Sequence, residues 1–278
     1  MERIILALDA SKPNLNTIEF ACYIANLTHS KLTAIFIMNI IGEEKAALKA
    51  LYALPYVETI TSADFPENKE KVNTCQENQR IFMTACSNNG VNFEIRFEKH
   101  ALAMDISEES RFADLVILDP DTSFENKPES SPSKFVREIL EQAECPVIIA
   151  PYSFEGINEI FLAYDGSKSS TVAIKHFAHI FPKLSNKTVT VLQVSEKPYP
   201  PTENSKLNDL LAAHFTQVNY KLFRGKAADE LFGHLLDKTN AFVVMGAYGR
   251  GLLSNLLKPS TSNLVVKTVN LAVFIAHS

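Results

Sequence analysis

The 278-residue chain has no run of lysine and arginine, and its formal net charge is −5. Proteins that bind nucleic acids or anionic membranes need a basic surface, so we expect neither kind of partner. The charge balance instead favours small molecules or an as yet unknown protein partner.

The N-terminus has no long apolar run. The stretch MERIILALDA breaks at Asp9, so it predicts a buried strand and neither a signal peptide nor a membrane span. The cysteines also lack any Cys-x-x-Cys pair, because Cys22, Cys75, Cys86 and Cys145 lie far apart. This spacing predicts reduced thiols rather than a structural zinc site, and we expect a cytoplasmic protein.

Signatures of catalysis are missing as well. The sequence has no Gly-x-Ser-x-Gly elbow and no evident Ser-His-Asp order, and the loop after Gly246 lacks the lysine of a P-loop. His176 and His179 share one face of a predicted helix without a further ligand nearby, so we expect ordinary surface or half-buried histidines. No catalytic residue and no metal ligand is assigned.

An internal repeat is present. Residues 3–27 match residues 159–184: each has an apolar strand, an Asp, a small residue, Ser-Lys and an amphipathic helix. Each half then offers further strands and helices in alternation and ends on an apolar strand, at 145–150 and 271–276. The length suits about two domains, which we place at residues 1–151 and 152–278.

The predicted strands are apolar at nearly every position, as in parallel strands that helices cover on both faces. We therefore predict an α/β protein of two doubly wound, Rossmann-like domains, each a mostly parallel five-stranded sheet with helices on both faces. The last strands of the halves should join them as an internal pseudo-dimer, because exposed apolar edges invite pairing. A homodimer remains open.

The halves differ between their second and third strands. Residues 41–90 make this connection in the first half, about twice the length found in the second, and they include a predicted helix near 67–88. This insertion either covers the crevice or builds an interface, or it is a solvated helical excursion, which we favour.

The segment 241–266 carries the clearest binding signal. An apolar strand runs into glycines at 246, 249 and 251, and Ser260, Thr261 and Ser262 follow. Glycines allow close approach of an anion, and a helix N-terminus attracts it, so the pattern predicts a phosphate cradle. A purely structural glycine turn is the alternative.

These motifs resemble the universal stress protein family. Nucleotide-binding members have an Asp after the first strand, often in Asp-Gly-Ser, and later Gly, two residues, Gly, nine residues, Gly and Ser or Thr. This chain has Asp165-Gly166-Ser167 and a matching late pattern with Pro259 in place of the last glycine. Proline has no N–H and a fixed φ, so this departure predicts weakened or absent nucleotide binding.

By this resemblance, ATP, accompanied by Mg²⁺, would bind in the C-terminal domain. Asp165 and Val194 would face the adenosine, Gly246 and Gly249 the ribose and phosphates, and Ser260, Thr261 and Ser262 the phosphate oxygens.

The equivalent loop of the first half has Asp119, Pro120, Asp121 and Thr122 where the glycine turn should be. Carboxylates repel a triphosphate, so we predict that this first site is lost and that Asp9 remains as a strand-end cap.

The resemblance implies a stress-responsive regulatory or chaperone-like protein with at most one adenine-nucleotide site. Two alternatives stay open: a slow ATPase that uses the same crevice, and an interaction scaffold that binds no nucleotide.

Overall fold

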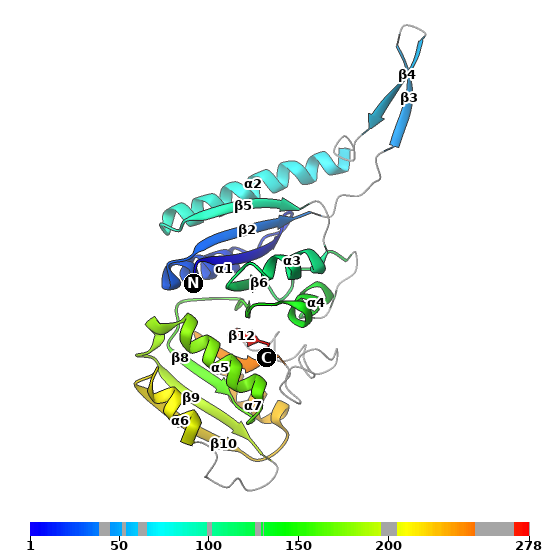
Figure 1. Cartoon of the computed structure of the whole chain (residues 1–278). Coiled ribbons are helices and arrows are strands. Elements are labelled where there is room, and N and C mark those ends of the chain that lie inside the picture. Colours follow the sequence, from blue (N-terminus) through cyan, green and yellow to red (C-terminus); the bar gives the residue numbers. More distant parts are fainter. Residues whose placement is uncertain are drawn as a thin grey trace.

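The computed structural model describes residues 1–38, 45–51, 54–60, 66–98, 102–125, 129, 131–195, 205–247 and 270–277. Ten of the strands in these ranges form one sheet in the order β10-β9-β8-β11-β12-β7-β6-β1-β2-β5 (Figure 1). Every neighbouring pair is parallel except β12 and β7.

Each half of the sheet has the same winding. The N-terminal half consists of β1 (Arg3–Asp9), α1 (Leu15–Thr28), β2 (Lys31–Ile37), α2 (Pro66–Asn88), β5 (Phe93–Glu98), α3 (Ala103–Ser110), β6 (Leu115–Leu118), α4 (Lys134–Gln142) and β7 (Val147–Ile149). The C-terminal half consists of β8 (Glu159–Ala163), α5 (Lys168–Ile180), the 3-10 turn η2 (Pro182–Leu184), β9 (Thr188–Val194), α6 (Ser205–Ala212), β10 (Gln217–Phe223), α7 (Ala227–Leu235), β11 (Ala241–Gly246) and β12 (Ala272–Ala276).

In both halves the five strands lie in the order third, second, first, fourth, fifth. This order reverses direction between the first and fourth strands, so each half has a crevice at their carboxyl ends. The predicted doubly wound α/β fold is confirmed.

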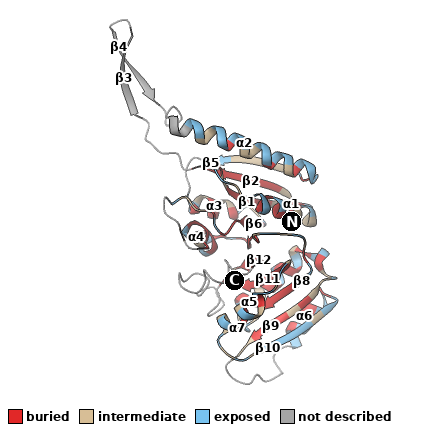
Figure 2. Cartoon of the chain, turned by 180° about the vertical axis from the view of Figure 1, so that it is seen from behind, coloured by how far each residue is buried: buried red, intermediate tan, exposed pale blue. Residues whose placement is uncertain are grey.

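Helices cover both faces of the sheet because successive strand residues point to opposite faces. Ile4 and Leu6 of β1 pack in the core beneath α1, α2, α5 and α6, whereas Ile5 and Ala7 pack in the core beneath α3, α4 and α7. Buried residues therefore fill both sides of the inner strands of the ten-stranded sheet, whereas the end strands β5 and β10 are only partly buried (Figure 2).

The two halves share one sheet and one core. Residues 147–149 of β7 pair antiparallel with residues 273–275 of β12, as predicted for the final strands. Phe20 of α1 contacts Phe154 and Phe242 at ring-centroid distances of 5.1 and 6.2 Å, so the aromatic packing also crosses between the halves. The two five-stranded sheets expected from sequence are thus one continuous ten-stranded sheet.

The long connection between β2 and β5 of the first half differs from the solvated helical excursion that we expected from sequence. It contains an antiparallel hairpin of β3 (Lys45–Leu51) and β4 (Leu54–Ile60), which the sequence patterns do not predict and which projects from the body (Figure 1). Helix α2 is not a solvated excursion, because Cys75, Phe82 and Cys86 on one side of it are 3%, 0% and 0% exposed.

No helix within the described ranges is both long enough and apolar enough to cross a membrane.

Candidate functional site

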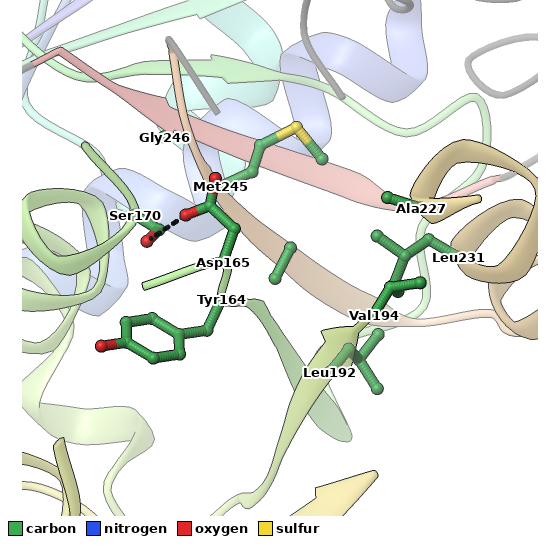
Figure 3. A pocket seen from close by; sticks show the side chains of 10 residues that line it. Tyr164, Asp165, Ser170, Leu192, Val194, Ala227, Leu231, Met245 and Gly246 are labelled. Atoms are coloured by element: carbon green, nitrogen blue, oxygen red, sulfur yellow. Dashed lines mark hydrogen bonds between the residues drawn. The ribbon is translucent and has the colours of Figure 1, made fainter. Parts of the chain in front are cut away.

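A pocket lies at the carboxyl ends of β8, β9 and β11, next to the start of α7 (Figure 3). This is the crevice that the strand order creates in the C-terminal half. The lining residues are Ala163, Tyr164, Asp165, Ser170, Leu192, Val194, Ala227, Leu231, Met245 and Gly246.

The Asp165 carboxylate is fixed by the turn that leads into α5. Its Oδ1 accepts a hydrogen bond from the backbone N–H of Ser167 at 2.9 Å. It also accepts one from the Ser170 hydroxyl at 2.7 Å (Figure 3). Ser167 is the N-cap of α5, since its hydroxyl accepts from the Ser170 N–H at 3.1 Å. The sequence therefore places an oriented carboxylate at the strand end and caps the helix with a different residue.

Burial by itself would raise the pKa of Asp165, but hydrogen bonds from Ser167 and Ser170 outweigh it and lower the pKa. The group is therefore an anion at neutral pH. Both of these hydrogen bonds use Oδ1, and within the described part of the chain Oδ2 forms no hydrogen bond. Because Asp165 is exposed, this oxygen can accept a hydrogen bond from a ligand.

The first half repeats this turn with a different cap. Asp9 Oδ1 accepts from the backbone N–H of Ser11 at 2.8 Å and from its hydroxyl at 2.6 Å. The N-cap of α1 is Asn14, which accepts from the Asn16 N–H at 3.0 Å. Asp9 therefore closes the turn at the end of β1, and α1 is capped by Asn14 because the helix starts further along the chain.

Gly246 lies where β11 meets the start of α5. A Cβ at this position would be 2.3 Å from Ser169 Oγ, 2.5 Å from Ser169 C and 2.7 Å from Ser170 N. Two of these atoms belong to the backbone and cannot rotate away. Gly246 is therefore needed for packing, whatever it contributes to a ligand.

The walls of the pocket are mostly apolar, with Leu192, Leu231 and Met245 buried. The cavity volume is only ≈ 30 Å³. Such a volume holds about two water molecules, so a nucleoside would have to bind across the mouth or widen the pocket.

The structure brings together three of the predicted site residues: Asp165, Val194 and Gly246 all line this pocket. The other four predicted residues, Gly249, Ser260, Thr261 and Ser262, lie outside the described residues, as does Pro259.

Sequence reasoning missed several lining residues. Tyr164 directly precedes Asp165, and Met245 directly precedes Gly246, so their position at a strand end could have identified them as lining residues. Ser170 lies on the helix that follows Asp165. Ala227 and Leu231 gave no such signal, because they come from α7.

The crevice of the N-terminal half is larger and acidic. Its cavity volume is ≈ 670 Å³. The lining residues are Leu8, Asp9, Lys12, Pro13, Asn14, Asp119, Asp121, Thr122, Ser123, Glu125 and Glu129. Five of these are carboxylates and only one is a cation, so the crevice repels phosphate groups.

Asp119 has a structural role in that crevice. It is 7% exposed, and its Oδ2 accepts from Asn14 Nδ2 at 2.6 Å and from Thr17 Oγ1 at 3.0 Å, while Oδ1 accepts from the Asp121 N–H at 2.8 Å. These bonds tie the end of β6 to the start of α1.

The carboxylates of this crevice also affect a neighbouring tyrosine. Burial raises the pKa of Tyr152 to about 12, and the neighbouring carboxylates of Asp121 and Asp119 add to the shift.

His179 on α5 contacts a second histidine ring and a backbone carbonyl oxygen. The His179 ring lies 5.0 Å from that of His214, and its Nδ1 is 2.6 Å from the Lys175 carbonyl oxygen. Among the residues that the structure describes, no group of three His, Cys, Asp or Glu side chains is arranged to hold a metal ion.

No family model matches the chain. It is 19% identical over 285 residues to the universal stress protein Slr1230 of Synechocystis sp. (strain ATCC 27184 / PCC 6803 / Kazusa), an alignment that covers 98% of this chain and 99% of the relative.

Solved structures share the fold over the whole length. A universal stress protein from Archaeoglobus fulgidus DSM 4304 has a TM-score of 0.67 and 16% identity, covering 99% of this chain and 96% of its own. The functionally unknown protein PA1789 from Pseudomonas aeruginosa PAO1 has a TM-score of 0.58 and 15% identity, covering 100% and 92%. Over nearly its whole length the chain is therefore similar in sequence to one universal stress protein and similar in fold to another, in agreement with the resemblance seen in its motifs.

Proposed function

We propose that the chain is a cytoplasmic, stress-responsive regulatory protein that binds one adenine nucleotide, ATP with Mg²⁺, in its C-terminal half. The observation that carries this proposal is the convergence of Asp165, Val194 and Gly246 on one pocket at the ends of three neighbouring strands. These residues are far apart in the sequence: Asp165 and Gly246 belong to the motifs that carry the family resemblance, and the resemblance implies Val194.

The described side chains suit the adenosine part of such a ligand. Asp165 Oδ2 would accept a hydrogen bond from a ribose hydroxyl or from the adenine amino group. Leu192, Val194 and Leu231 would cover one side of the base, which is largely apolar. The phosphates would be held by Gly249, Ser260, Thr261 and Ser262, as the resemblance implies.

We propose a single site because the two crevices differ in charge. The N-terminal crevice has Asp9, Asp119, Asp121, Glu125 and Glu129 where phosphates would lie. The carboxylates would repel an anionic ligand and make its binding less favourable, since Lys12 is the one cation among the lining residues.

The small volume of the C-terminal cavity, ≈ 30 Å³, favours one alternative function. If the pocket does not open, the chain is an interaction scaffold in which Asp165 and Gly246 only shape the start of α5. A slow ATPase at the same site is the enzymatic alternative.

Calorimetric titration of the full chain with MgATP separates these functions. We expect one site per chain, and Asp165→Asn should weaken binding by about ten- to hundredfold, because it replaces a charged acceptor. Asp9→Asn, at the equivalent position of the first half, is the matched control and should leave binding unchanged.

No binding by the folded wild-type chain would refute the nucleotide proposal and favour the scaffold, whereas a stoichiometry of two would refute the single site. Pro259→Gly restores a backbone N–H and should tighten binding about tenfold. Phosphate release that depends on Asp165 would instead identify the ATPase.

A further inference from the structure

Two cysteines from different helices meet in the core of the N-terminal half. Cys22 of α1 and Cys86 of α2 are both 0% exposed, and their Sγ atoms are 3.7 Å apart. Both are free thiols. The pair is separated by 64 positions in the sequence, so only the packing of α2 against α1 brings the sulfurs together.

Several contacts hold the two helices in this register. Asn26 Nδ2 donates to the Asn89 carbonyl oxygen at 2.9 Å, and Asn89 Nδ2 donates to Glu19 Oε2 at 3.2 Å. Further along α2, Asn78 Nδ2 donates to the Ala10 carbonyl oxygen at 2.9 Å. The sulfurs therefore stay close, and each needs to move less than about 1 Å to reach the length of an S–S bond.

We propose that Cys22 and Cys86 form a reversible disulfide when the chain meets a hydroperoxide, so that oxidation joins α1 to α2 covalently. This inference is independent of nucleotide binding, since neither cysteine lines either crevice.

The chemistry needs one equivalent of peroxide. The Cys22 thiolate attacks a peroxide oxygen: an S–O bond forms, the O–O bond breaks, and the leaving oxygen takes up a proton to become water when the oxidant is hydrogen peroxide. The Cys86 sulfur then attacks the sulfenic acid on Cys22, the S–S bond forms, and the hydroxyl leaves with the Cys86 proton as a second water. Two thiols lose two electrons, and the peroxide gains them.

Either thiol can donate the hydrogen bond that joins the two sulfurs. When Cys86 donates, the bond lowers the pKa of Cys22 despite its burial, and the same bond and burial raise the pKa of Cys86. In that arrangement Cys22 is the attacking thiolate and Cys86 the resolving thiol. Because both are buried, we expect oxidation to proceed through brief openings of α2.

The other cysteines cannot compete for this bond. Cys75 precedes Cys86 by eleven residues on α2, which places it roughly 17 Å away along the helix. Cys145 packs in the core on the opposite face of the sheet. The fold therefore allows one disulfide partner for Cys22 among the cysteines of the chain.

The test treats the full-length chain with hydrogen peroxide under native conditions, alkylates the remaining thiols and maps the peptides without reduction. We expect one cross-linked peptide that joins Cys22 to Cys86, lost after dithiothreitol, with Cys75 and Cys145 alkylated. Cys22→Ala and Cys86→Ala should each abolish it, and Cys75→Ala, at another buried cysteine of α2, should retain it.

Hydrogen exchange measures the consequence for α2. The amides of α2 should exchange at least about tenfold more slowly in the oxidised chain, because the bond limits its opening. The proposal is overturned if the native wild-type chain gives no such link while the urea-unfolded chain is oxidised. It is also overturned if Cys75 or Cys145 takes the bond, or if exchange in α2 is unchanged.

Discussion

Asp165 and Gly246 at the C-terminal pocket stabilise the local fold and also lie where a ligand could bind. Asp165 orders the turn before α5 through Ser167 and Ser170 and still keeps one carboxylate oxygen without a hydrogen bond among the described residues. Gly246 lets β11 approach the backbone at Ser169 more closely than any side chain would allow. The geometry of the pocket thus depends on residues whose loss would also disturb the fold.

Gly246→Ala should lower the free energy of unfolding by about 2–3 kcal/mol, because the new Cβ would overlap backbone atoms of α5. Gly233→Ala is the matched control: Gly233 is an exposed helical residue, and a Cβ added there would have no atom within 4 Å, so the variant should gain up to about 1 kcal/mol. Urea unfolding measures both. Equal effects would show that Gly246 has no packing role.

Among the elements, β5 lies at one end of the sheet and is tied down by charge as well as by its ladder with β2. Glu94 of β5 accepts from Lys31 Nζ at 2.6 Å and from Arg96 Nε at 2.9 Å. Arg96 also reaches Glu109 at 3.2 Å, and Glu109 pairs with Arg3 at 2.6 Å. The network connects β5 to β1, β2 and α3.

This network makes stability depend on pH. Hydrogen bonds from Lys31 and Arg96 lower the pKa of Glu94 from 4.5 to about 2. A carboxyl whose pKa is lower in the folded state stabilises it above the unfolded pKa and loses this effect as pH falls through the folded value. The contribution of Glu94 should therefore be complete above pH 4.5 and disappear towards pH 2.

Glu94→Gln should cost about 1 kcal/mol or less at neutral pH, since the side chains of the pair with Lys31 are 35% and 42% exposed. Its stability should converge with that of the wild type as the pH falls towards 2. Unfolding followed at several pH values provides the measurement, with Glu98→Gln on the same strand as the control. A difference that persists at low pH would contradict the electrostatic explanation.

At the scale of the whole molecule, the described parts of the two halves share one sheet and one core. The β7–β12 pairing joins their sheets, and Phe20, Phe154 and Phe242 join their cores. The division into domains 1–151 and 152–278 stays a prediction, because the sheet and the core run across this boundary.

We expect the full chain to unfold in a single transition in urea, with circular dichroism and tyrosine fluorescence coinciding. Residues 1–151 and 152–278, produced separately, should self-associate, because β7 or β12 then becomes an uncovered apolar edge. Two resolved transitions in the full chain, or two monomeric and stable halves, would contradict this expectation.

The repeat, the parallel strands and the joining of the halves could be predicted from the amino-acid sequence. These features follow from local patterns: apolar runs such as those of β1 and β6 admit only strands covered on both faces. The strand ends also located Asp165 and Gly246, because carboxyl ends of parallel strands meet at one edge, whereas Val194 was implied by the family resemblance.

The packing roles of these residues, and the contacts between distant groups, became evident from the three-dimensional arrangement alone. The need for glycine at 246 depends on how closely α5 approaches, and the Cys22–Cys86 contact depends on the register of α2. Side-chain periodicity fixes which face of a helix is buried, but not its position along its neighbour. Contacts between helices far apart in the sequence are therefore set by packing of the whole core.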